Sequence, residues 1–231
     1  MKQLTLDLSP DAPPTLDNFI AGHNAELLST LALLAAGDEA QPPLPSRHLY
    51  LWGGPGSGRS HLLHATLERA MGNGRAVHYL NAADVRASLP ETEGALMAVD
   101  NVERLGAEAQ IALFNAFNRS RLLRQSLLLS GPLPPRTLKL REDLRTRIGQ
   151  CLIYEVQPLD DAARARILAT LAERRGLRLA DEVTEFLLRH GNRDLSSLRK
   201  VLDALDAGSL ERKRPITLPL LRELMQHGLS I

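Results

Sequence analysis

The chain lacks most of the features that mark secreted and membrane-bound proteins. Cys151 is its one cysteine, so no disulfide can form within the chain, and its place at the head of an apolar run indicates a core residue. No run of about 18 apolar residues occurs, as a membrane-spanning helix would need. No basic and then apolar leader precedes the first predicted domain. We therefore expect a soluble, cytoplasmic protein.

Excess charge and clustered metal ligands are also missing. The 28 lysines and arginines nearly balance the 27 aspartates and glutamates, and a net charge of +1 argues against a broad nucleic-acid-binding surface. The seven histidines are scattered, and only His61 and His64 share a helix face, so we expect no histidine metal site. A length of 231 residues fits one α/β domain and a smaller one.

A glycine-rich turn follows the apolar run at residues 48–52 and leads into a helical pattern. From Gly53 to Ser60 it fits the phosphate-loop pattern G-x-x-x-x-G-K-[ST], with Arg59 in place of the lysine. Glycines let backbone N–H groups approach phosphate oxygens, and the Ser60 hydroxyl can reach Mg²⁺. The alternative is an ordinary Gly/Pro turn. The predicted site comprises Gly53, Gly54, Pro55, Gly56, Ser57, Gly58, Arg59, Ser60 and the adjacent His61.

A second anchor is the apolar run at residues 95–101, which contains Asp100 at the predicted strand end. The continuous run indicates a strand buried on both faces of a parallel sheet, and its end is where α/β sheets bind ligands. This arrangement holds Mg²⁺ opposite a phosphate loop. The alternative is an aspartate that merely ends a strand. Asn101 follows where a catalytic ATPase often has a second acid, and an amide cannot act as a base.

Strands alternating with helices predict an α/β fold, a doubly wound parallel sheet of five strands. Beyond the two strands above, strands are expected at residues 76–80, 126–130 and 152–156, and helices at 24–36, 60–71, 82–88 and 108–124. The last of these helices should point Ile111, Phe114 and Phe117 inward and end in solvated arginines, Arg119 among them.

From residue 160 onward no strand pattern remains. Helices are expected at residues 160–175, 180–190, 193–207 and 218–226, which form a helical lid domain. We therefore divide the chain into residues 1–14, a motif with a flexible tether, 15–159, the nucleotide-binding domain, and 160–231, the lid.

Two arginines are candidates for contact with a nucleotide. Arg147 lies in the charge-dense stretch 140–148, which is either an exposed polar helix or a segment that projects this arginine into a neighbouring protein's nucleotide site. Arg193 opens the third lid helix after Asn192. A cation in the first turn opposes the helix dipole, and a contact with phosphate would account for it.

The first residues of the chain alternate between apolar and polar before a proline-rich stretch. An edge strand or a frayed terminus is one interpretation. The other is a short linear motif that docks in a partner's groove, with Gln3 as its polar contact and Leu4, Leu6 and Leu8 as its anchors.

Together these residues resemble the AAA+ family and, within it, the branch of the replication initiator DnaA. Residues 16–19, 58–64 and 99–101 match that branch's lead-in segment, Walker A motif and Walker B motif. The resemblance covers about residues 15–231 and stops where DnaA continues into its DNA-binding domain. Residues 3–8 look like the hexapeptide that binds the DNA polymerase III sliding clamp.

The resemblance implies a negative regulator of replication initiation that docks on the DNA-loaded clamp and stimulates hydrolysis of DnaA-bound ATP. By position, Arg147 matches the arginine finger that acts on DnaA in trans, and Arg193 matches sensor 2, which contacts the chain's own nucleotide. The implied cofactors are ADP or ATP, with Phe19 beside the nucleotide and Mg²⁺ held by Ser60 and Asp100. Arg59, Asn101 and Pro132 depart from the family pattern, which implies weak intrinsic hydrolysis.

Two other functions stay open at the level of sequence. An autonomous AAA+ ATPase that remodels a replication complex, similar to a helicase loader, predicts turnover without DnaA or clamp and its loss in Asp100→Ala. A DNA-binding initiator predicts duplex affinity with a steep salt dependence, against which the near-neutral charge argues. The preference for ADP or ATP and the oligomeric state, including a homo-oligomer, are left open.

Overall fold

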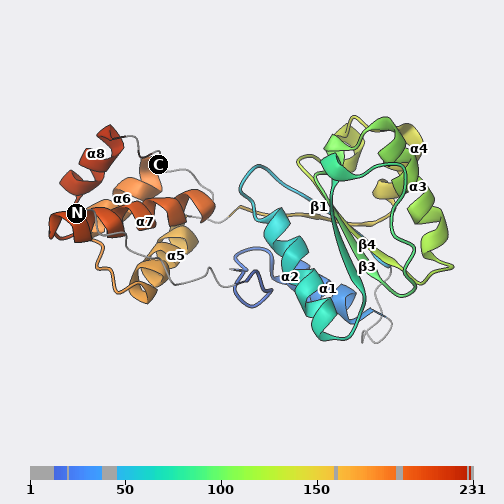
Figure 1. The fold of residues 1–231 in the computed structure, drawn as a ribbon, viewed down its shortest axis with the longest axis horizontal. Coiled ribbons are helices and arrows are strands. Elements are labelled where there is room, and N and C mark those ends of the chain that lie inside the picture. The colour runs from blue at the N-terminus through green and yellow to red at the C-terminus, as the bar shows by residue number, and fades with distance from the viewer. Residues whose placement is uncertain are drawn as a thin grey trace.

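The computed structural model describes residues 13–19, 21–37, 46–158, 161–190, 195–227 and 229. These residues form a sheet covered by helices and a separate helical body, which Figure 1 shows beside it in orange and red. Among these residues, no helix combines the length and the hydrophobicity that crossing a membrane requires.

The sheet has five parallel strands in the order β2-β3-β4-β1-β5. Its strands are β1 His48–Trp52, β2 Val77–Asn81, β3 Leu96–Asp100, β4 Ser126–Gly131 and β5 Leu152–Glu155. Every residue of β3 and β4 is buried, which explains the apolar runs at residues 96–99 and 127–129 within them. The edge strands β2 and β5 are more exposed. The predicted α/β fold with its parallel five-stranded sheet is therefore confirmed.

Helices cover both faces of the sheet (Figure 1). On one face, α1 Ala25–Ala36 and α2 Arg59–Gly72 pack with alternate strand residues such as Leu49 and Leu51. On the other face, α3 Ala107–Ser120 and α4 Glu142–Gly149 pack with Tyr50 and its neighbours. Because side chains alternate along a strand, consecutive residues of β1 enter opposite cores.

Two expectations about the helices are wrong. The helix expected at residues 82–88 is only the 3₁₀ turn Ala82–Asp84, which the Asn81 side chain caps by accepting from the Ala83 N–H at 3.1 Å. Ile111 is 43 % exposed, because the buried stripe of α3 is made mostly of small side chains. The stripe comprises Ala109, Ala112, Leu113, Ala116, Phe117 and Ser120.

Arg119 also departs from the expected solvated helix end. Its guanidinium donates to the Leu89 carbonyl at 2.9 Å and pairs with Glu91 at 3.3 Å. The arginine therefore ties the loop between β2 and β3 to α3.

The helical body consists of α5 Asp161–Arg174, α6 Asp181–His190, α7 Leu195–Arg212 and α8 Leu218–Gln226. Residues from all four helices build its own core, for example Leu168, Leu187, Leu202 and Leu221. The helices expected from the sequence in this part of the chain are confirmed within a few residues, apart from the longer α7.

Candidate functional site

The phosphate loop connects β1 to α2 in a backbone conformation that requires glycine. Gly58 has φ +95°, and a Cβ added there would lie 2.7 Å from Cε2 of Phe19. At Gly53 an added Cβ would lie 2.8 Å from Oγ of Ser57 and 3.0 Å from the Val156 carbonyl oxygen. The Gly53 N–H donates to the Gly131 carbonyl at 3.3 Å, which joins the loop to the end of β4. Neighbouring atoms therefore leave no room for a side chain at Gly53 or Gly58. An ordinary Gly/Pro turn has no such requirement.

The lead-in segment packs directly on this loop. The Phe19 ring lies against Gly58, and its centroid is 5.6 Å from that of His61 on α2. Nε2 of His61 lies 3.2 Å from the Thr15 carbonyl oxygen. Thr15 and Asn18 exchange backbone-to-side-chain hydrogen bonds of 3.0 and 3.1 Å, which fixes the turn before Phe19. The predicted residues Phe19, Gly58 and His61 are thus brought together.

The two sequence anchors meet at Asp100. Oγ of Ser60 donates to Oδ2 of Asp100 at 2.6 Å, although the two residues are 40 positions apart. Oγ of Ser130, at the end of β4, donates to Oδ1 of the same carboxylate, and the Asn101 N–H donates to Oγ of Ser130 at 3.1 Å. Asp100 is 2 % exposed, so its charge relies on these donors.

Tyr79 joins this site without having been predicted. Its hydroxyl donates to Oδ2 of Asp100 at 3.0 Å, and its ring stacks on His64 with centroids 4.1 Å apart. Burial first, and the neighbouring Asp100 charge second, raise the pKa of Tyr79 to about 12. The hydroxyl therefore keeps its proton and acts as a donor. In the sequence, the only indication of this role was a tyrosine near the end of a predicted strand. The strand order, which places β2 next to β3, comes from the structure.

The loop fits a phosphate group. Within the described part of the chain, Oγ of Ser57 and one terminal guanidinium nitrogen of Arg59 are buried without a hydrogen-bond partner. Buried polar atoms of this kind are rare, and a bound anion would satisfy both. The Ser60 and Asp100 oxygens are the hard ligands that Mg²⁺ prefers. No group of three or more His, Cys, Asp or Glu side chains among the described residues could hold a metal by itself, so phosphate oxygens and water would complete the shell.

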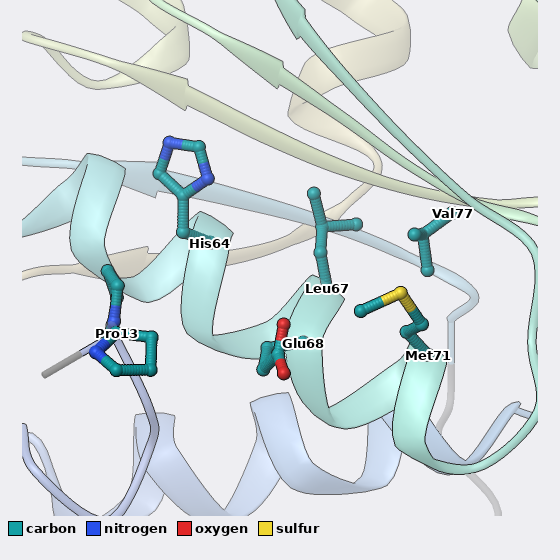
Figure 2. A pocket seen from close by; sticks show the side chains of 7 residues that line it. Pro13, His64, Leu67, Glu68, Met71 and Val77 are labelled. Atoms are coloured by element: carbon teal, nitrogen blue, oxygen red, sulfur yellow. The ribbon is translucent and has the colours of Figure 1, made fainter.

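The hollow lined by the residues in Figure 2 is not this site. It measures about 390 Å³ and lies beside α2, away from the predicted phosphate-loop residues. Its lining is Pro13, Pro14, His64, Leu67, Glu68, Met71 and Val77.

Cys151 is a buried residue of the core beneath α3 and α4. Burial raises the pKa of its thiol to about 12, as expected for a core residue.

Arg147 lies away from α2, in the last turn of α4 on the opposite face of the sheet (Figure 1). Its guanidinium donates to Oδ1 of Asn118 at 2.8 Å and lies 5.7 Å from the centre of the Phe114 ring. Both contacts come from α3. The side chain is half-buried, so α3 holds the guanidinium in place while leaving part of it accessible.

Two groups of predicted residues lie outside the described residues. These are the N-terminal motif, Gln3, Leu4, Leu6 and Leu8, and the lid arginine, Arg193.

The helical body resembles a known family of domains. Residues 161–225 match the family model described as "Hda, lid domain". The helical body is therefore similar to the Hda lid domain. The described residues have the AAA+ fold, an α/β domain followed by a helical lid, as the structural neighbours show.

Three of these neighbours cover most of the chain. Domain III of the Thermotoga maritima replication initiation protein DnaA is 20% identical with a TM-score of 0.76, over 96% of this chain and 100% of that one. AMPPCP-bound DnaA from Aquifex aeolicus is 23% identical with a TM-score of 0.68, over 88% and 69%. The Thermotoga maritima RuvB Holliday junction branch migration motor is 20% identical with a TM-score of 0.70, over 93% and 72%. At these identities the likeness establishes the fold.

Proposed function

We propose that this protein is a nucleotide-bound regulator of replication initiation that acts on DnaA. The observation that carries the proposal is an Hda-type lid, at residues 161–225, on a domain with the fold of DnaA. The relation of the Hda family to DnaA supports DnaA as the partner, and the proposal places the protein with this partner in the cytoplasm.

The proposal assigns ADP or ATP with Mg²⁺ to the phosphate loop. Backbone N–H groups of the loop and the Arg59 guanidinium would neutralise the phosphates, Phe19 would form one wall, and Arg193 would reach the nucleotide from the lid. Bound Mg²⁺ would neutralise charge on the phosphate oxygens. The unpartnered buried atoms of Ser57 and Arg59 support this assignment.

The chain's own residues support weak hydrolysis. The backbone at Asn101 is left-handed, with φ 59°, and its N–H is held by Ser130, so an amide is fixed after Asp100 where a second acid would activate water. Arg59 replaces the compact ammonium of the usual lysine with a planar fork. The nucleotide is then mainly a structural ligand.

Arg147 supplies the activating group in this proposal. Its hydrogen bond to Asn118 and its position over Phe114 order the guanidinium before a partner arrives. In other NTPases an arginine supplied by a second protein contributes on the order of 10³–10⁵ in rate. A chain with little activity of its own is therefore able to activate DnaA strongly.

The N-terminal motif completes the proposal as a tether to the sliding clamp. Gln3, Leu4, Leu6 and Leu8 would dock in the clamp, and the proline-containing stretch that follows would link it to the AAA+ domain. Docking on clamp that is loaded on DNA raises the local concentration of the protein near DnaA without a tight direct contact.

The test compares arginine variants of α4 for stimulation of ATP hydrolysis by DnaA in the presence of DNA-loaded clamp. Arg147→Ala should lose the stimulation by a factor on the order of 10³, the lower end of such contributions. Arg145→Ala is the matched control, because two residues along a helix point about 200° apart. Equal stimulation by wild type and Arg147→Ala would rule out the finger.

An autonomous ATPase is the second candidate. The Ser60–Asp100 pair favours it, because this pair is the metal-binding half of a working NTPase site. It requires turnover by the isolated chain, which Asp100→Ala would abolish.

A further inference from the structure

Three hydroxyl groups converge on the carboxylate of Asp100. Ser60 and Tyr79 donate to Oδ2 at 2.6 and 3.0 Å, and Ser130 donates to Oδ1. A carboxylate offers about four lone-pair positions. The three donors fix its orientation and leave it one further position.

Tyr79 is the donor that the phosphate-loop architecture does not require. It pairs with Ala98 in the register of β2 and β3, and Ala98 is two residues before Asp100. Alternate residues share a face of the sheet, so Tyr79 and Asp100 lie on the same face, the one that α2 covers. The edge strand β2 thereby contributes a hydroxyl to a carboxylate at the end of β3.

His64 holds the Tyr79 ring from α2. The rings stack with centroids 4.1 Å apart and an interplanar angle of 26°. Figure 2 shows His64 projecting from α2 above the hollow formed by Leu67, Met71 and Val77. Ser60 and His64 are four residues apart and share one side of α2. The contacts Ser60–Asp100, Asp100–Tyr79 and Tyr79–His64 therefore close a ring between α2 and the sheet.

We propose that Tyr79 is a positioning residue for the Mg²⁺ site, in which its hydroxyl orients Asp100 toward Ser60 while His64 fixes its ring. The proposal rests on the proposed nucleotide function. Tyr79 itself touches neither metal nor nucleotide. Hydrogen-bond partners behind a metal ligand orient it, and their loss commonly costs 10–100-fold in metal affinity.

The experiment measures Mn²⁺ binding to the full chain saturated with ADP, by the electron paramagnetic resonance signal of free Mn²⁺. Mn²⁺ replaces Mg²⁺ at sites of oxygen ligands. Tyr79→Phe keeps the ring and its stack and removes only the hydroxyl. We expect it to bind Mn²⁺ about tenfold more weakly, with ADP affinity in EDTA unchanged.

Tyr154→Phe is the matched control. Its hydroxyl bonds Thr30 and Glu26, each at 3.0 Å, at the other edge of the sheet. This variant should bind Mn²⁺ like wild type. His64→Ala leaves the Tyr79 hydroxyl but removes its stacking partner, so its Mn²⁺ affinity should fall between wild type and Tyr79→Phe.

The outcomes separate this inference from the function on which it rests. A wild-type chain that binds neither ADP nor ATP overturns both. If wild type binds ADP and Mn²⁺, a Tyr79→Phe variant of equal or higher Mn²⁺ affinity overturns the positioning role alone. A His64→Ala variant that matches wild type overturns the role of the stack.

Discussion

At the scale of single residues, the site is held by hydrogen bonds between side chains of α2, β2, β3 and β4, while among the described residues the buried Oγ of Ser57 and one nitrogen of Arg59 have no partner. Asp100 receives three hydroxyl groups, and its neighbours in the site could be predicted only in part. Ser60 and Asp100 follow from two local patterns in the sequence. Tyr79 does not, because its contact depends on which strand lies beside β3, and no local pattern encodes strand order. Phe19 was predicted beside the nucleotide through the resemblance, whereas its packing against Gly58 follows only from the structure.

His48 gives a prediction about acid stability. Its Nδ1 accepts the Leu127 N–H at 3.2 Å, and its ring meets Phe117 edge-on. Burial first, and the nearby Arg47 charge second, lower the pKa of His48 from 6.5 to about 4. The unfolded chain therefore binds the proton more readily, so the stabilisation present above pH 6.5 is lost as pH falls from 6.5 toward 4.

The measurement is the free energy of unfolding against pH for wild type and His48→Gln. The advantage of wild type over the variant should shrink by about 2 kcal/mol between pH 7 and pH 4, less than the full shift because the ring is partly exposed. Parallel curves for the two proteins would show that His48 does not titrate in this way.

At the scale of elements, α3 serves as the platform for the arginine of α4. Its inner face is made largely of alanines, which lets the helix lie close to the sheet, and the partly buried Phe114 and the exposed Asn118 contact Arg147. The sequence predicted the helix but not which residues form its inner face. Bulky residues, Ile111 among them, were expected to point inward, but Ile111 is exposed. Alanine is weakly hydrophobic, and its burial in a close helix–sheet contact is hard to foresee from periodicity alone.

Removal of the Asn118 side chain should weaken the proposed finger without abolishing it. Asn118→Ala removes one hydrogen bond to a charged group, worth about 1 kcal/mol at an exposed position, so stimulation of DnaA should fall about fivefold. Asn115→Ala, an exposed position on the same helix, controls for helix propensity. A full loss in both variants, with Arg147 intact, would mean that α3 acts through folding and not through Arg147.

At the scale of the whole molecule, a parallel sheet domain carries the candidate nucleotide site, and a helical body that matches the Hda lid domain follows it. The change from strands to helices could be predicted because strand patterns end before residue 160 and amphipathic helices follow. The predicted bounds of β1 and α1 agree with the structure to within one residue. The apolar run at residues 48–52 marks the strand, and the glycine after Ala36 marks the end of the helix. Nothing local in the sequence determines how the lid and the N-terminal motif meet their partners.

In the function that we propose, the protein activates another protein's ATP hydrolysis and turns over little ATP itself. The most direct measurement is a single-turnover assay that follows radiolabelled ATP bound in advance to DnaA, after addition of this protein loaded with unlabelled ADP, with and without DNA-loaded clamp. We expect rapid hydrolysis of the labelled ATP on DnaA only when protein and clamp are both present. The protein alone should hydrolyse a negligible amount of free ATP. Unchanged hydrolysis of the DnaA-bound label, or brisk turnover by the isolated protein, would contradict the proposed function.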